Sequence, residues 1–244
     1  MNPITLSIKA RKSTRQFESK AIPSDIKSEI LEAAFQAPTA GNQMLYAIID
    51  VTDQTLKNQL AKTCDNQPFI AEAPLVLIFL ADTRRWYDAY VEAGLEVRNP
   101  GMGDLLLAIQ DAVIAAQNAV VAAESFGIGS CYIGDILENV EIHRDVLNLD
   151  PYTVPISMLV MGYPTESQIN RTKPNRFDRK YIVHENKYRR LTADELRAMH
   201  EAQANRPDYN FDQAVQAFGK RKYMSDFSLE MTRSSEIYVK AFMK

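Results

Sequence analysis

The chain has 244 residues, of which 46% are hydrophobic and 24% charged, as in an ordinary soluble globular protein with a sizeable core. Its formal net charge of −3 argues against general binding to nucleic acid or to an anionic membrane, because both require an excess of Lys and Arg. No stretch approaches the run of about 18 apolar residues that a membrane span needs, and the N-terminus does not follow the basic-then-apolar layout of a signal peptide. We therefore expect one main domain with appendages, located in the cytoplasm.

The cysteines and histidines indicate neither a disulfide framework nor a metal site. Cys64 and Cys131 form no Cys-x-x-Cys pair, so we expect both to be reduced and buried. His143, His184 and His200 are scattered without metal-ligand spacing, and we predict no metal. No Gly-x-Ser-x-Gly motif is present, so the sequence does not support hydrolytic chemistry.

Pro3 to Ala10 predicts a short helix, and the basic run from Arg11 to Phe17 follows it. If the run is extended, Arg11, Ser13 and Arg15 project to one side of the backbone. Guanidinium groups match phosphate or carbonyl oxygens, and side chains about 13 Å apart can hold opposite ends of one mid-sized anion. The pattern alone favours the other interpretation, a solvated basic link between two helices.

The next segments alternate between helices and strands. Pro23 and Ser24 open a helix with an apolar face that Pro38 ends, and Thr39 to Gln43 forms a polar turn. After it we expect a buried strand at 45–51, a helix at 54–62 and a second, strongly apolar strand at 73–81. The charged and aromatic stretch 82–100 fits a mobile cover over an active site better than a nucleic-acid surface, because its acidic residues cancel its basic ones.

Asp104 to Phe126 is apolar nearly all round, which predicts a long helix buried on every side. The glycine-rich segment after it is neither of the common phosphate-binding loops. Tyr132 stands where a dinucleotide fingerprint needs its third glycine, and Asp135 follows Gly134 where a P-loop needs Lys. A further strand is expected at 154–161, and from Thr192 onward a polar helical tail that cannot form a core of its own.

The order of these segments resembles that of the flavin-dependent nitroreductases. That family opens with Arg/His-x-Ser-x-Arg/Lys-x-Phe/Tyr, which Arg11 to Phe17 fits, and similar segments follow in order at 37–43, 64–67, 127–135 and 173–188. The resemblance implies an α+β fold, a mixed α/β sandwich with a central sheet of four or five strands flanked by helices and a C-terminal helical extension. It implies an FMN-binding domain at residues 1–190, an extension at 191–244 that packs on the partner of a homodimer, and the Asp104 to Phe126 helix at the dimer contact.

The resemblance also implies a set of FMN-binding residues. They are Arg11, Lys12, Ser13, Arg15, Thr39, Asn42, Gln67, Tyr132, Ile133, Gly134, Lys173 and Arg176. The turn with Thr39 and Asn42 comes from the partner subunit in this family and touches the flavin phosphate and ribityl chain. Residues 132–134 offer backbone groups to the ring, where glycine permits close approach.

Some of these residues carry more specific roles. The amide of Gln67 suits the pyrimidine edge of a flavin, because it both donates and accepts hydrogen bonds. Lys173 resembles the first residue of a Lys-Pro-Arg motif whose cations close over the phosphate. Asn175 is inserted where the Arg usually falls, which makes Arg176 the expected equivalent. Arg15, or Lys12, would stabilise negative charge near N1 and the C2 carbonyl of the flavin, so Arg15 is the candidate catalytic residue.

These features predict an FMN-dependent oxidoreductase that takes hydride from NAD(P)H and reduces nitroaromatics, quinones or flavins by a ping-pong mechanism. An FMN-binding sensor or carrier without NAD(P)H turnover would use the same motifs. An adaptor that binds through its aromatic loop and C-terminal helices, without any cofactor, is the third possibility.

Overall fold

The computed structural model describes residues 2–243, so Met1 and Lys244, the outer ends of the two predicted domains, lie outside the described residues. The chain divides into two compact units. The first runs up to Arg171 and resumes at Glu230, and the second covers Thr172–Leu229. The division predicted at residue 190, and the packing of the extension on a partner, stay predictions.

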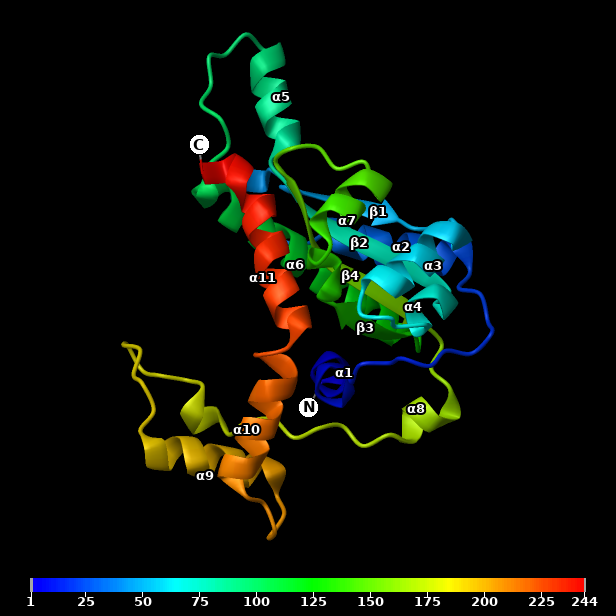
Figure 1. Cartoon of the computed structure of the whole chain (residues 1–244). Helices are drawn as coiled ribbons and strands as arrows, with labels where there is room; N and C mark the ends of the chain where they lie inside the picture. The colour runs from blue at the N-terminus through cyan, green and yellow to red at the C-terminus, as the bar shows by residue number, and fades with distance from the viewer. Residues whose placement is uncertain (1, 244) are drawn as a thin grey trace. The chain divides into compact units, whose positions relative to one another are not determined.

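The first unit contains a four-stranded antiparallel sheet with strand order β1-β2-β4-β3 (Figure 1). The strands are β1 (Tyr46–Asp50), β2 (Leu75–Asp82), β3 (Gly129–Ile133) and β4 (Thr153–Gly162). The helices of this unit are α1 (Pro3–Ala10), α2 (Ser24–Phe35), α3 (Gln54–Thr63), α4 (Phe69–Glu72), α5 (Arg84–Glu92), α6 (Met102–Ser125), α7 (Val140–Val146) and α8 (Glu166–Asn170). The predicted α+β architecture is confirmed.

The alternation of side chains along β2 explains the layers of this unit. Leu75, Leu77 and Phe79 pack in one core cluster with residues of α2 and α6. The intervening side chains pack in a second cluster with α3 and α4. Successive strand residues point to opposite faces, so a strand covered on both faces has to be apolar throughout. All eight residues of β2 are buried.

Helix α6 forms the centre of this unit, but the prediction that it is buried on every side is wrong for the single chain. Its small residues pack against the sheet and α2, while Leu106, Leu107, Val113 and Ile114 are between 38% and 53% exposed. These four lie on one side of the helix at helical spacing, so the chain leaves an apolar stripe of α6 uncovered.

Within residues 2–243, α6 is the one helix whose length and composition would allow it to cross a membrane, and 44% of its apolar window is buried inside the fold. The central helix of a soluble domain has the same properties, and α6 supplies a core cluster here. The cytoplasmic location stays a prediction.

The second unit contains α9 (Ala193–Ala204) and α10 (Phe211–Lys222), as the helical tail predicted. Helix α11 (Asp226–Val239) starts in the second unit, and from Glu230 it belongs to the first. Tyr238 and Phe242 complete a third core cluster there, together with Leu105 and Val154.

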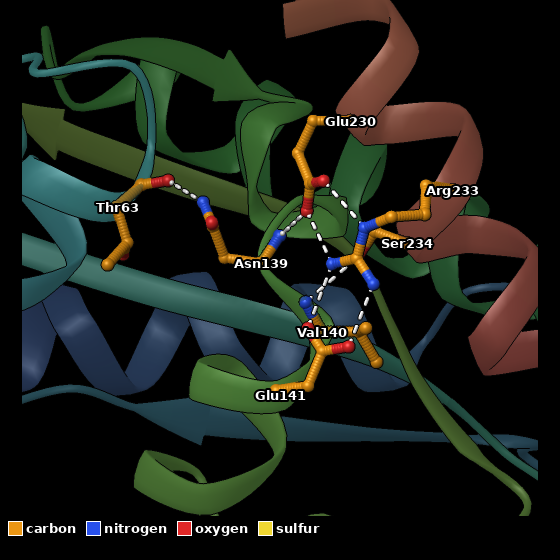
Figure 2. A network of polar contacts seen from close by, with 7 residues as sticks. All are labelled: Thr63, Asn139, Val140, Glu141, Glu230, Arg233 and Ser234. Atoms are coloured by element: carbon orange, nitrogen blue, oxygen red, sulfur yellow. Dashed lines mark hydrogen bonds and ion pairs between the residues drawn. The ribbon is translucent and has the colours of Figure 1, made fainter.

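A polar network fixes this last part of the chain to the start of α7 (Figure 2). Glu230 accepts a hydrogen bond from the backbone N–H of Asn139, at 3.0 Å, and the buried Ser234 hydroxyl accepts one from Val140 N–H, at 2.9 Å. Arg233 bridges Glu230 and Glu141. The first N–H groups of α7 have no partner within their own helix, so the side chains of α11 satisfy them.

Candidate functional site

The basic segment Arg11 to Phe17 runs along the outer edge of β3. Ser13 forms a parallel bridge with Ser130, and Thr14 donates its N–H to the Ser130 carbonyl at 2.9 Å. The Thr14 side chain is buried against Gly129, where a Cβ would lie 2.3 Å from its Oγ1. The segment is therefore extended, as the sequence predicts, and glycine at 129 is what permits its close approach.

Ser13 and Arg15 lie beside Cys131, in the middle of β3, and the charge of Arg11 also acts on this thiol. Burial raises the pKa of the Cys131 thiol, while Arg15, Ser13 and Arg11 act in the opposite direction. Cys64 is likewise buried and reduced.

Arg11 is only partly satisfied by the protein. Its Nη2 lies 3.5 Å from Ser130 Oγ, and its guanidinium lies 5.9 Å from the centroid of the Tyr132 ring. Its Nε is buried, and no described residue provides a hydrogen-bond partner for it. A buried, unpaired cation donor is costly unless an acceptor completes it, which fits an anionic ligand at this edge.

Lys12 bonds to a different part of the chain, the end of α8 and the residue that follows it. Its Nζ donates to the carbonyls of Ile169 and Arg171, at 2.6 and 2.5 Å, and Arg171 donates to the Ser13 carbonyl. Lys12 therefore fixes the chain that follows α8 against the basic segment.

Tyr132, Ile133 and Gly134 form the end of β3 and the turn after it. The Tyr132 hydroxyl donates to Gln117 at 3.2 Å, burial raises the pKa of Tyr132 to about 12, and Ile133 packs in the core beneath α3. Because backbone groups alternate along a strand, Tyr132 presents its N–H and C=O to the same outer edge as the Ser130 carbonyl. Around Gly134, a Cβ would meet no atom within 4 Å. Backbone groups and open space are thus what residues 132–134 offer to a ligand.

Gln67 reaches the same edge from the turn between α3 and α4. Its Nε2 donates to the Cys64 carbonyl at 2.9 Å and to Asp135 Oδ2 at 2.8 Å. Asp135 was not among the predicted site residues. It is the last residue of the glycine-rich segment, but no local pattern indicates that it reaches Gln67.

A second carboxyl group lies behind Asp135. Burial first, and then the charges of Asp135 and Asp65, raise the pKa of Glu138 to about 8. The Glu138 side chain is 6% exposed, and no described residue provides a hydrogen-bond partner for its Oε1. Burial penalises the charged form, so the Glu138 carboxyl group favours its protonated form at neutral pH.

The predicted turn with Thr39 and Asn42 is built on a buried acid of α6. Asp111 is bonded by the Thr39 hydroxyl and by the N–H groups of Ala40 and Leu45, the last two at 3.1 Å. Asn42 is exposed, with a positive φ of 57°. Asp111 thus stabilises a tight turn that leaves the Asn42 side chain in solvent.

This turn lies at the opposite corner of the sheet from the basic segment. It leads into β1, one edge of the sheet, whereas the basic segment follows β3, the other edge. The two edges are three strand spacings, or about 14 Å, apart. Tyr46 aligns through Ala81 with Val154, and Ser130 aligns with Met161. The steps from Val154 to Met161 add roughly 23 Å along β4.

In the stretch predicted as a cover, residues 84–92 form α5, and this helix is tied to the same turn. Trp86 Nε1 donates to the Gln43 carbonyl at 2.8 Å, and Tyr90 lies 3.5 Å from the Gln43 amide. Together with Arg98 and other residues of the following loop they line a cavity of about 260 Å³.

Lys173 and Arg176 belong to the second unit, where Lys173 is half-buried and Arg176 exposed. Between them, Asn175 exchanges two hydrogen bonds with Gln203 of α9, at 3.0 and 3.2 Å. Asn175, the residue inserted into the motif, therefore bonds to α9 within the second unit, to which it also belongs.

The residues at the edge of β3 suit a ligand that is anionic, planar and able to form hydrogen bonds. It combines Arg11 and Arg15, an amide on Gln67, the outer backbone groups of Tyr132 and the open space beside Gly134. Within residues 2–243 no group of three or more His, Cys, Asp or Glu side chains could hold a metal ion.

Comparison with known proteins identifies relatives over most of the chain. A model of the nitroreductase family matches residues 8–163. An NADPH-dependent oxidoreductase of Staphylococcus aureus is 28% identical over 183 residues, which are 74% of this chain and 72% of the relative.

Two solved structures cover nearly the whole chain. NfrA2 of B. megaterium is 28% identical, with a TM-score of 0.83 and complete coverage of both chains. The NADPH:FMN oxidoreductase of Vibrio harveyi, complexed with NAD+, has a TM-score of 0.82 over 98% of both chains. Its 24% identity makes it a likeness of fold alone.

Proposed function

Since the chain belongs to the nitroreductase family, we propose that it is an FMN-dependent oxidoreductase that takes hydride from NAD(P)H and reduces nitroaromatics, quinones or flavins. The observation that supports this proposal best is the edge of β3, where Arg11 lies beside Ser130 and Tyr132, and Gln67 bonds to Asp135 at the end of the same strand, next to a turn with room for a ring. The S. aureus relative is named for NADPH-dependent oxidoreduction, and the V. harveyi structure for FMN.

The residues present fit FMN. Arg11 has a buried donor for which no described residue provides a partner, as expected where a phosphate would complete it. Lys173 and Arg176 stay proposed phosphate-binding residues, since a phosphate monoester carries nearly two negative charges. Gln67 supplies an amide for the pyrimidine side of a flavin, and Gly134 leaves space for the ring.

When bound, FMN supplies the hydride-accepting and hydride-donating chemistry. The chain contributes binding and electrostatics. Arg15 would offset negative charge that develops near N1 and the C2 carbonyl, which gives it the catalytic role. No side chain is required as an acid or base in this scheme, so a catalytic triad is not needed.

We propose that the active form is a homodimer with sites shared between subunits. The turn with Thr39 and Asn42 and the segment with Arg11 lie at opposite corners of one sheet, so two chains are required to bring both to one cofactor. The exposed stripe of α6 supplies apolar surface for the contact, and so do Ile4, Leu6 and Ile8 of α1, each at least 50% exposed.

The first experiment is the visible spectrum of the purified protein, followed by identification of the released chromophore. FMN is expected, and release of FAD, or a colourless protein that FMN cannot reconstitute, would contradict the proposal. The second outcome would favour an adaptor.

Steady-state kinetics then test the reaction. A nicotinamide and an aromatic acceptor must both stack on the ring to exchange hydride, so we expect them to exclude each other and to give parallel double-reciprocal lines. Intersecting lines would indicate a ternary complex. FMN binding without NAD(P)H oxidation would instead identify a sensor or carrier.

A further inference from the structure

The Gln67 amide has one hydrogen-bonding capacity left in this structure. Its NH2 group has two donors, and both are used, one on the Cys64 carbonyl and one on Asp135 Oδ2. These two partners can only accept, since one is a backbone carbonyl and the other a carboxylate. The chemistry of the partners therefore fixes which end of the amide turns into the protein. Gln67 Oε1, a pure acceptor, is the group left for a ligand.

We propose that Asp135 is a positioning residue of the flavin site, which holds the Gln67 amide so that it offers the cofactor an acceptor and no donor. This inference rests on the proposed function, because it takes Gln67 as a flavin contact. The sequence predicted that the Gln67 amide both donates to the flavin and accepts from it, whereas here the amide only accepts.

The surroundings of Asp135 suit this task. Asp135 directly follows Gly134 and begins the short 3-10 helix Asp135–Leu137, so the turn that leaves room for the ring also carries the carboxylate. The buried Glu138 ends this short helix and donates its N–H to the Asp135 carbonyl at 3.1 Å. The backbone of Asp135 is thus fixed in the turn, and its Oδ2 accepts the hydrogen bond from Gln67.

The chemical consequence is selectivity for an N–H group. The pyrimidine ring of a flavin carries an imide N–H between two carbonyls, and of these only the N–H can bond to Gln67 Oε1. An amide free to rotate would also offer its donors to the neighbouring carbonyls. Asp135 therefore preorganises the contact, because it prevents the Gln67 amide from turning its NH2 group toward the flavin.

The test is a double-mutant cycle on FMN affinity, measured by titrating apoprotein with FMN and following flavin fluorescence. Gln67→Ala is expected to raise the dissociation constant about three- to tenfold, as loss of one net hydrogen bond would. Asp135→Ala should raise it by a similar factor. In the Gln67→Ala background, Asp135→Ala should change it less than about twofold, because the positioned group is gone.

Two further variants separate positioning from charge and from folding. Asp135→Asn keeps an acceptor for Gln67 and should bind FMN no more weakly than the wild type. Asp65→Asn removes a neighbouring exposed carboxylate that does not touch Gln67, and it should leave affinity unchanged. If Asp135→Ala does not fold, Asp135→Ser serves in its place, since its shorter side chain cannot reach Gln67.

The outcomes are distinct. An Asp135→Ala effect of the same size in both backgrounds would indicate a structural role and overturn the inference, as would normal affinity in Asp135→Ala beside weak binding in Gln67→Ala. A wild-type protein that binds no FMN would overturn the proposed function as well.

Discussion

Gly129 and Gly134 lie close in sequence but meet opposite surroundings, which separates a structural glycine from a functional one. A Cβ at position 129 would clash with Thr14, while at position 134 it would meet no atom within 4 Å, at a φ of −79° that any residue can adopt. We expect Gly134→Ala to keep thermal stability and to weaken FMN binding, because the methyl group enters the space proposed for the ring. Gly129→Ala should destabilise the fold by about 1–3 kcal/mol. Thermal melts and FMN titration measure the two effects.

A second substitution checks that Gly129 is needed because of its contact with Thr14. Thr14→Gly should recover most of the stability lost in Gly129→Ala, since it removes the clashing atoms. Undiminished FMN affinity in Gly134→Ala would mean that the ring does not lie beside this turn.

At the scale of single residues, the sequence predicted the backbone conformation of the basic segment better than it predicted the hydrogen-bond partners of individual side chains. The alternation of Arg11, Ser13 and Arg15 follows from extended backbone alone, and Ser13 forms a β-bridge with Ser130 in the structure. The partners of Lys12 are more than 150 positions away in the chain, and Asp135 is 68 positions from Gln67. Local patterns carry no information about such contacts, because they form only when the whole sheet assembles.

Where three elements meet near Asp135, their acidic residues make stability depend on pH. Glu138 precedes α7, Asp65 follows α3 and Glu230 lies on α11, and burial raises the pKa of Glu138 from 4.5 to about 8. The folded protein therefore holds one more proton than the unfolded chain between these values, so stability should fall as pH rises from about 4.5 through 8. We expect Glu138→Gln, which cannot ionise, to lose this slope and to exceed the wild type above pH 8.

Urea midpoints at pH 5.5 and 8.5 measure the effect. Glu92→Gln, which neutralises an exposed carboxylate on α5, is the control and should keep the wild-type slope. An unaltered slope in Glu138→Gln would show that another group is responsible.

At the scale of elements, hydrophobic pattern predicted most of the sheet and its helices, and it failed where a face needs a second partner. The composition of α6 is apolar on all sides, but pattern cannot say which chain covers which side. Likewise, the apolar residues of α11 indicate that it packs somewhere. Its docking on the start of α7 depends on the individual bonds of Glu230 and Ser234.

For the whole molecule, shared sites predict that two defective variants can repair each other. Arg11→Ala removes the proposed phosphate contact at one corner of the sheet, and Asn42→Gly removes an exposed amide at the other while tolerating the positive φ. In a hybrid dimer one site carries both substitutions and the other carries none. Random exchange of subunits should therefore restore about a quarter of the sites.

FMN binding and NAD(P)H oxidation, measured before and after exchange, report the recovery. Mixing each variant with itself is the control. Confirmed hybrids with no gain in either measurement would mean that the two corners do not serve one site.

The position of the basic segment beside β3 also bears on how the protein resists aggregation. An edge strand with unpaired backbone groups is a template for another chain. The bridge from Ser13 covers the start of this edge, and Thr14 N–H bonds to the Ser130 carbonyl, while the Tyr132 carbonyl accepts only the weak donor of the Cys131 thiol. In the proposed holoenzyme the cofactor shields that remainder. Loss of FMN would then expose an aggregation-prone edge of the sheet. The supply of cofactor during synthesis would therefore decide how much of the protein stays in solution.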